Sequence, residues 1–302
     1  MMPTSIKLGD TIGILAPASG DKNLFIDEKI CILKNLGFKI KTGNHLYDKL
    51  GYLAGTDEAR ASDLMDFFCD DNIKMIMCLR GGYGSMRILP YLDFKKLKNI
   101  NKIFMGYSDI TCILNTLYSK LGLVTFHGPM ATSDFNDKYT LSSFINTVTN
   151  LTSSYNIVNP SHIPLICHGT TNATGTLIGG NLSIICSTLG TPYEIDTHNR
   201  ILFIEDVGED VYSIDRMLCQ LKLSGKLDSC SGFLLGQFKN CNNKKTSYTL
   251  NDVFNNYIFS LNKPVISNFM SGHDTPNLTI PIGAKAKLDV KKARLCVELM
   301  EL

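Results

Sequence analysis

Several features that define common protein classes are missing from this 302-residue sequence. Its ten cysteines are scattered, with no CxxC pair and no histidine at ligand spacing, which argues against a zinc site and against a disulfide framework. No apolar stretch reaches the 18 residues that a membrane-spanning helix needs. The first twenty residues have neither a basic leader nor a long apolar segment, so we expect no signal peptide. These absences predict a reduced, cytoplasmic chain without a metal site.

An excess of charge of one sign is also missing. Lysine and arginine number 30 against 28 aspartates and glutamates, for a net charge of +2 and a pI near 8.0. Basic clusters such as Lys95–Lys96 are short, and aromatic residues do not interleave with them. We therefore expect neither nucleic acid nor a membrane as a partner.

The first half of the chain alternates short apolar runs with amphipathic segments. Strands are predicted at 11–16, 38–41, 73–79, 102–105 and 123–126, with helical patterns between them. Such alternation predicts a parallel sheet covered by helices on both faces. The clearest helix is expected over 109–120, where apolar residues repeat at helical spacing.

A change of pattern predicts a second domain. Residues 151–173 are rich in Ser, Thr, Asn and Pro and lack a helical period, which is typical of a linker. Several closely spaced short strands follow from residue 174 on, which predicts a smaller, β-rich domain with a mixed or barrel-like sheet. We expect an α/β domain over 1–150, the linker over 151–173 and the β-rich domain over 174–302.

A serine stands where a predicted buried strand turns into a helix. The stretch FMGYSDIT places Ser108 between the apolar strand and the helical pattern. Ligands of parallel α/β sheets bind beyond the carboxyl ends of the strands, and N–H groups at a helix start can stabilise an oxyanion. Ser108 is either a nucleophile, on a turn like a nucleophile elbow but with Ile110 in place of glycine, or a helix cap, a role that serine favours.

A serine nucleophile needs a base, and two histidines are candidates. His127 ends a predicted strand of the sheet that carries Ser108. His273 lies in a loop of the second domain flanked by glycine and proline, and such loops often carry function. The residues alone favour neither histidine.

The acid that would orient the base has a candidate in the stretch LFIEDVGE. Glu205 and Asp206 directly follow four apolar strand residues. Neighbouring strand residues point to opposite faces, so only one of the two is expected to face the site. A carboxylate at a strand end can also be simply the first polar residue of a loop.

A glycine-rich turn follows another predicted strand in CLRGGYGSMR. Gly81 and Gly82 let the backbone approach a ligand closely and present N–H groups to it. The match to a dinucleotide-binding motif is incomplete, so we interpret the turn as a second oxyanion donor. Arg80 could pair with a substrate carboxylate or cover the sheet edge, and Gly81 and Tyr83 are further candidates for substrate contact.

These segments, taken in order along the chain, resemble one family. GDTIGILAPAS, GYLAGTDEARASDL, CLRGGYGSMRILPYLD, MGYSDIT, TFHGPM, GTLIGGNLS, LFIEDVGE, IDRMLCQL and GHDTPNLTIPIGAKAKLD are similar to segments of the LD-carboxypeptidases. These enzymes are serine muramoyltetrapeptide carboxypeptidases of bacterial cell-wall recycling. The resemblance extends from about residue 8 to residue 290, nearly the whole chain.

The resemblance implies a Ser-Glu-His triad formed by Ser108, Glu205 and His273. It thereby favours His273 over His127 and nucleophile over helix cap. It also implies that the backbone N–H groups of Asp109 and of Gly82 form the oxyanion hole. The fold it implies is an N-terminal flavodoxin-like or amidotransferase-like domain and a C-terminal β-rich domain, assembled as a homodimer, with no cofactor.

The implied reaction is hydrolysis of the bond between L-Lys or meso-diaminopimelate and the terminal D-Ala of a muropeptide tetrapeptide. Relatives that confer microcin immunity use a tryptophan loop to stack on a nucleotide, and this chain has no tryptophan. That departure argues against a peptide–nucleotide substrate. A peptidase of toxic peptide–nucleotide conjugates and a non-catalytic muropeptide-binding module remain the alternatives.

Overall fold

The computed structural model describes residues 1–20, 25–151, 154–242 and 247–298. The chain divides into two compact units, residues 1–152 and residues 153–302. The sequence analysis expected the second domain to be the smaller, but the two units are of similar length. Within the described residues, no helix is long and apolar enough to cross a membrane, and no cluster of three or more potential metal ligands is found.

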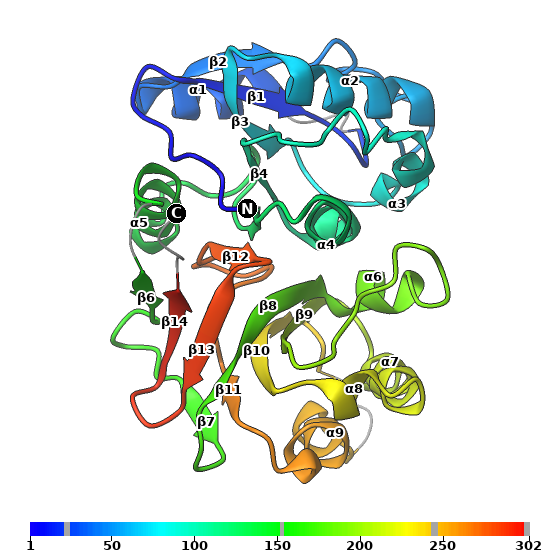
Figure 1. The fold of residues 1–302 in the computed structure, drawn as a ribbon, viewed down its shortest axis with the longest axis vertical. Coiled ribbons are helices and arrows are strands. Elements are labelled where there is room, and N and C mark those ends of the chain that lie inside the picture. Colours follow the sequence, from blue (N-terminus) through cyan, green and yellow to red (C-terminus); the bar gives the residue numbers. More distant parts are fainter. Residues whose placement is uncertain (21–24, 152–153, 243–246, 299–302) are drawn as a thin grey trace. The chain divides into compact units, whose positions relative to one another are not determined.

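The N-terminal unit is built on a parallel sheet (Figure 1). Its five strands run in the order β2-β1-β3-β4-β5, and all neighbours are parallel. This is the flavodoxin-like order of a doubly wound sheet. Its strands are β1 (Thr11–Leu15), β2 (Lys39–Thr42), β3 (Ile73–Cys78), β4 (Ile103–Gly106) and β5 (Thr125–His127). The structure thus confirms the strands predicted for this half, with shifts of one or two residues at their ends.

Helices and 3₁₀ turns connect these strands. They are α1 (Ile26–Asn35), α2 (Asp57–Cys69), α3 (Ser85–Ile88), η1 (Leu89–Tyr91), η2 (Ser108–Ile110), α4 (Thr111–Leu121) and α5 (Lys138–Thr149). Right-handed crossovers in this strand order place α1 on one face and α2, α3 and α4 on the other. The apolar stripe predicted for α4 is buried, and Gly122 ends that helix in the left-handed conformation. The sequence analysis missed α5, whose start is capped by Asp137.

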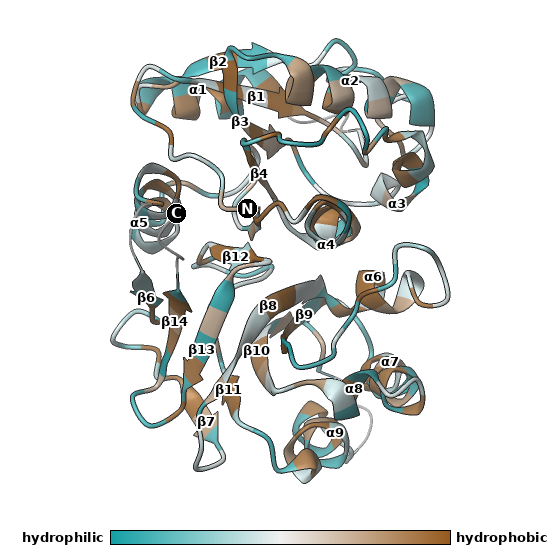
Figure 2. Ribbon diagram, viewed as in Figure 1, coloured by the Kyte–Doolittle hydropathy of each residue, from teal (hydrophilic) through white to brown (hydrophobic). Residues whose placement is uncertain are grey.

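The C-terminal unit contains a mixed sheet of eight strands in the order β6-β14-β13-β8-β9-β10-β11-β7. The central strands β8 to β11 are mutually parallel, and the flanking pairs are antiparallel. The strands of the unit are β6 (Tyr155–Ile157), β7 (Ile166–His168), β8 (Ala173–Asn181), β9 (Ile201–Val207), β10 (Gly232–Lys239), β11 (Val265–Ser267), β12 (Ile280–Ile282), β13 (Lys285–Asp289) and β14 (Arg294–Glu298). In Figure 2 hydrophobic residues line β4 in the first unit and β8 and β9 in the second.

Two of these strands correct the interpretation of residues 151–173 as a linker. β6 pairs with β14 and β7 pairs with β11, so the segment supplies both edges of the C-terminal sheet. No local pattern predicts these two strands, because each is only three residues long and lies among Pro, Asn and Ser residues, which are typical of loops.

Helices connect the parallel strands of the C-terminal sheet. They are α6 (Leu182–Ser187), α7 (Val211–Leu223), α8 (Lys226–Ser229), α9 (Leu250–Tyr257) and η3 (Phe259–Leu261). Because β8 to β11 follow one another in space as in sequence, right-handed crossovers place these helices on one face of the sheet.

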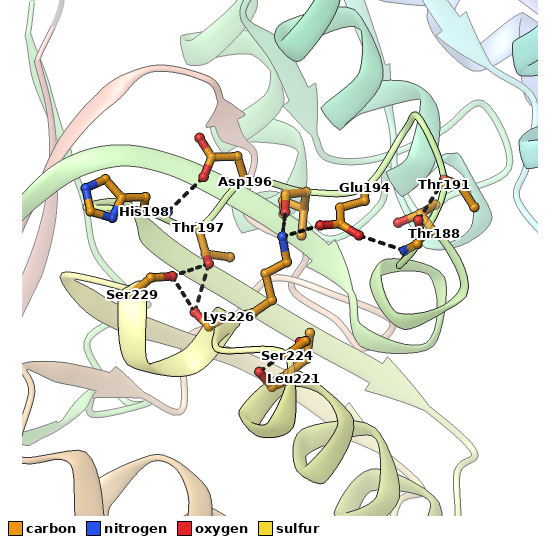
Figure 3. A network of polar contacts seen from close by, with 12 residues as sticks. Thr188, Thr191, Glu194, Asp196, Thr197, His198, Leu221, Ser224, Lys226 and Ser229 are labelled. Carbon is orange, nitrogen blue, oxygen red and sulfur yellow. Dashed lines mark hydrogen bonds and ion pairs between the residues drawn. The ribbon is translucent and has the colours of Figure 1, made fainter.

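A polar network fixes the loop that leads from α6 into β9 (Figure 3). The ammonium group of Lys226 lies 2.6 Å from Glu194 Oε1 and donates a hydrogen bond of 2.8 Å to the carbonyl of Ile195. The hydroxyl of Thr197 donates to the carbonyl of Lys226 at 2.8 Å. Figure 3 shows these contacts joining the loop to α8.

Candidate functional site

Ser108 is the first residue of η2, immediately beyond the carboxyl end of β4. Tyr107 occupies the N-cap position of that turn, in extended conformation. The interpretation of Ser108 as the helix cap is therefore wrong, because the cap position lies one residue earlier.

Ser108 adopts a left-handed backbone conformation, with φ of 63°. This region is unfavourable for serine, and such a residue typically stores about 1–3 kcal/mol of strain that the surrounding structure must offset. Gly106 helps to make the sharp turn, since a Cβ atom there would lie 2.8 Å from Ile110. A strained serine on a strand-to-helix turn is the arrangement of a nucleophile elbow, although Ile110 replaces the second glycine of that motif.

The glycine-rich turn after β3 packs directly against this serine. A Cβ atom added to Gly81 would lie 2.9 Å from Ser108 Cβ, 3.2 Å from Ser108 Oγ and 3.3 Å from the backbone nitrogen of Asp109. The turn therefore lies beside both the hydroxyl and the N–H group at the start of η2. Only glycine allows the backbone to lie so close to Ser108. The sequence predicted a close backbone approach at this turn, but to a ligand rather than to a side chain of the protein.

We expect Gly81→Ala to lower the rate of any reaction that uses the Ser108 hydroxyl by about 100-fold, because the new methyl group must displace the Ser108 side chain from its position. The backbone of Gly81 requires no positive φ, so the effect should come from this contact and not from backbone strain. Steady-state kinetics would measure the loss. Gly51→Ala controls for backbone strain alone, since Gly51 has φ of 61° and no atom lies within 4 Å of the added Cβ there; an equal loss in both variants would contradict the prediction.

The turn is held in place by Ser19 and Arg60. Ser19 Oγ accepts a hydrogen bond of 3.0 Å from the backbone N–H of Tyr83, and Gly82, with φ of 109°, leaves room for Ser19. The guanidinium of Arg60 is buried and donates to the carbonyls of Gly84, at 2.8 Å, and of Pro17. Arg60 thereby ties the loop after β1 to the loop after β3. The sequence analysis missed both residues because nothing local distinguishes them from surface polar residues.

The proposed substrate-contact residues differ in exposure. Tyr83 is half exposed, and its ring packs edge-on against Tyr52 with centroids 5.3 Å apart. Arg80 is partly buried and lies close to Gly82.

The side chain of Asp109 has a structural role. Its Oδ2 accepts a hydrogen bond of 2.8 Å from the backbone N–H of Ser85, and the side chain is buried. This contact fastens the start of α3 to the turn at Ser108 and leaves the backbone of Asp109 in the first turn of a helix, where N–H groups lack intrahelical partners.

His127 is fully buried at the end of β5. Its ring lies 5.8 Å from the ring of Tyr107, measured between centroids. The second histidine candidate, His273, lies in the other unit and has a different environment.

In the C-terminal unit, His273 and Glu205 form a pair. The Nδ1 atom of His273 lies 2.6 Å from Oε2 of Glu205, and the Glu205 side chain is fully buried while 15% of the His273 side chain is exposed. Glu205 lies on β9, and His273 lies in the loop between β11 and β12. With Nδ1–H donating to the carboxylate, Nε2 of the neutral imidazole is the atom that can accept a proton.

Asp206 points to the opposite face of β9. Its Oδ2 accepts hydrogen bonds of 2.9 and 2.7 Å from the backbone and the hydroxyl of Ser183, and its Oδ1 accepts one of 3.1 Å from Asn181. These contacts stabilise the start of α6. Glu205 thus contacts the loop of His273 and Asp206 the start of α6, as expected from the alternation of side-chain directions along a strand.

Burial raises the pKa of Glu205 above its ordinary value of 4.5, because desolvation penalises the carboxylate. The hydrogen bond and the charge of His273 oppose this shift only in part, and the nearby charge of Asp206 adds to it. The fold therefore keeps Glu205 in a place that is unfavourable for its charge.

This shift predicts a pH dependence of stability. Between 4.5 and the higher pKa of the folded state, the native protein holds more protons on Glu205 than the unfolded chain does. The contribution of Glu205 to the free energy of unfolding should therefore fall as the pH rises through this window. Denaturant unfolding from pH 4 to pH 8 should show wild type losing stability relative to Glu205→Gln as the pH rises; parallel profiles would contradict this.

Comparison with known proteins identifies the family. A model of the LD-carboxypeptidase N-terminal domain matches residues 12–128, and one of the LD-carboxypeptidase C-terminal domain matches residues 174–288. A probable murein peptide carboxypeptidase of Bacillus subtilis is 40% identical over 98% of this chain and 94% of its own length. The murein tetrapeptide carboxypeptidase of Pseudomonas aeruginosa is 30% identical over 94% of each chain.

A solved structure is also similar. The microcin self-immunity protein MccF of Escherichia coli, in complex with aspartyl sulfamoyl adenosine, superposes with a TM-score of 0.92 and 25% identity over 100% of this chain and 99% of that one. Two matching domain models and a relative of 40% identity over almost the full length leave one assignment. The chain belongs to the LD-carboxypeptidase family.

Proposed function

We propose that this protein is a serine carboxypeptidase that removes the terminal D-Ala from the tetrapeptide of a muropeptide. The observation that carries the catalytic part is the 2.6 Å contact between His273 Nδ1 and Glu205, because a hydrogen bond from Nδ1–H to this carboxylate would make Nε2 the proton acceptor that a general base needs. The left-handed backbone of Ser108, beside the glycine-rich turn, supports the nucleophile. The substrate class rests on the related carboxypeptidases.

In the proposed reaction, His273 Nε2 takes the proton of the Ser108 hydroxyl as its oxygen attacks the carbonyl that precedes D-Ala. The negative charge that develops on the carbonyl oxygen is stabilised by the N–H groups of Asp109 and Gly82. His273 then gives the proton to the amine of D-Ala as the peptide bond breaks, leaving the tripeptide as an ester on Ser108. Water then attacks the ester as His273 takes one of its protons, and His273 returns that proton to Ser108 Oγ as the acyl–oxygen bond breaks and the tripeptide leaves.

The experiment that tests the function is a comparison of substrates. Purified protein would be incubated with L-Ala-D-Glu-diaminopimelyl-D-Ala, with its L-Lys counterpart, and with an aminoacyl-nucleotide analogue, and products would be identified by mass spectrometry. Release of D-Ala from either tetrapeptide is the expected result. Cleavage of the nucleotide analogue alone would favour the activity suggested by the likeness to MccF, and binding of a tetrapeptide without cleavage would indicate a muropeptide-binding module.

A cytoplasmic location, which the scattered cysteines predict, and a homodimeric state, which the family resemblance implies, are part of the proposal. Light scattering coupled to gel filtration would test the dimer, and cell fractionation would test the location.

A further inference from the structure

We propose that Gln237 is the residue that positions His273 for proton transfer. This inference rests on the proposed function, because it assigns to Gln237 the task of holding the general base. Gln237 lies on β10, next to the strand that carries Glu205, and its side chain is buried. It contacts the loop of His273 and not His273 itself.

The side-chain amide of Gln237 bonds the His273 loop at two points. Its Oε1 accepts a hydrogen bond of 2.7 Å from the backbone N–H of Asp274, and its Nε2 donates one of 2.9 Å to the carbonyl of Pro276. The two points lie one and three residues after His273. A single rigid amide group therefore fixes the direction in which the chain leaves the histidine.

The backbone supports the same contact from the other side of His273. The N–H of Gln237 donates to the carbonyl of Ser271 at 3.1 Å. A Cβ atom on Gly272 would lie 2.9 Å from Glu205 Oε2 and 3.2 Å from Gln237. The loop thus approaches β9 and β10 as closely as glycine permits, on the residue just before His273.

Asn277 adds a contact within the loop. Its Oδ1 accepts a hydrogen bond of 3.1 Å from the N–H of Gly272. This bond closes the loop on itself but does not anchor it to the sheet. The side chain of Gln237 anchors the His273 loop to the sheet, because Gln237 lies on β10 and β10 is paired with β9, the strand of Glu205.

Loss of the Gln237 hydrogen bonds is expected to affect catalysis because a loop without this anchor can shift while the protein stays folded. His273 and Glu205 come from segments 68 residues apart in sequence, so their 2.6 Å contact depends on where the loop is held. Loss of the amide would leave the N–H of Asp274 and the buried carbonyl of Pro276 without these bonds, and the loop would move to satisfy them. A displacement of about 1 Å at a catalytic group can cost about 100-fold in rate.

The first test is Gln237→Met, which keeps the length of the side chain and removes both hydrogen bonds. We expect kcat for D-Ala release to fall about 10- to 100-fold with KM little changed, because the base and not substrate binding is affected. The downfield proton NMR signal of His273 Nδ1–H, recorded without substrate, should weaken or shift. The matched control is Lys239→Met on the same strand, which breaks only the exposed 3.2 Å ion pair with Asp274 and should leave both readouts unchanged.

A second variant keeps the test decisive if Gln237→Met does not fold. In Gln237→Glu the introduced carboxyl group can replace both bonds only when it is protonated. Among the described residues, the ionisable groups near it are Glu205, His273, Asp274 and Lys239, which is paired with Asp274. The ratio of its kcat to that of wild type should therefore rise as the pH falls. A constant ratio, or a folded Gln237→Met with normal kcat and an unchanged His273 signal, would overturn the proposal.

The two proposals fail in different ways. A wild-type protein that releases no D-Ala would refute the proposed function, and a weakened His273 signal in Gln237→Met would still support the positioning role. A wild-type protein whose activity depends on Ser108, together with a fully active Gln237→Met, would refute only the role of Gln237.

Discussion

Replacing Ser108 with alanine is expected to lower the rate of D-Ala release by about 10⁴-fold or more, a loss of about 5 kcal/mol in transition-state stabilisation. The hydroxyl supplies the bond-forming oxygen, and no neighbouring group of the turn after β4 offers a replacement in the proposed mechanism. Release of D-Ala should be followed by mass spectrometry with wild type and variant at equal concentration. Substrate binding should persist, because the glycine-rich turn is untouched.

Ser119→Ala is the matched control for this experiment. Ser119 lies on the helix that follows Ser108, and its hydroxyl donates only to the carbonyl of Thr116 within that helix. Its replacement should leave kcat within twofold of wild type, a change of about 0.4 kcal/mol. Equal release by Ser108→Ala and wild type would show that the serine is not the nucleophile, whatever strain its backbone carries.

Replacing Glu205 with glutamine should cost about 10⁴-fold in kcat, as for the orienting acid of other serine hydrolases. The amide of glutamine can donate to Nδ1, and the ring then carries its proton on Nε2. In that tautomer His273 cannot accept the proton of Ser108. The shape of the buried site changes little, so the loss should appear in kcat while the fold is retained.

Glu205→Gln is expected to lose activity without losing stability. Burial raises the pKa of Glu205, so removing its charge should not destabilise the protein at neutral pH and should remove the pH dependence described above. The control is Glu194→Gln, a carboxylate of the same unit that is paired with Lys226 near the surface and should be dispensable for catalysis. An active Glu205→Gln would mean that the contact with His273 is only structural.

Local pattern predicted those parts of the fold that depend on short segments. Four strands of the first sheet, β1, β3, β4 and β5, are buried along nearly their whole length, and α4 has a continuous apolar stripe, so these elements were recognisable. β6 and β7 were not, because strands of three residues at a sheet edge obtain their conformation from their neighbours rather than from their own composition. The same limit explains why Gln237 looked like any polar residue of a strand.

The candidate site also combines features that the sequence predicted with features that only the tertiary structure decided. The sequence by itself placed Ser108 at a strand-to-helix turn and two acids at the end of a strand, because residue order and alternation are local properties. Only the tertiary structure decided that Tyr107 and not Ser108 takes the cap position, that Glu205 and not Asp206 meets His273, and that Gly81 packs against the serine. These outcomes depend on backbone dihedral angles and on contacts between segments far apart in the chain. Such contacts are set by how strands pair and loops pack, and no short stretch of sequence carries that information.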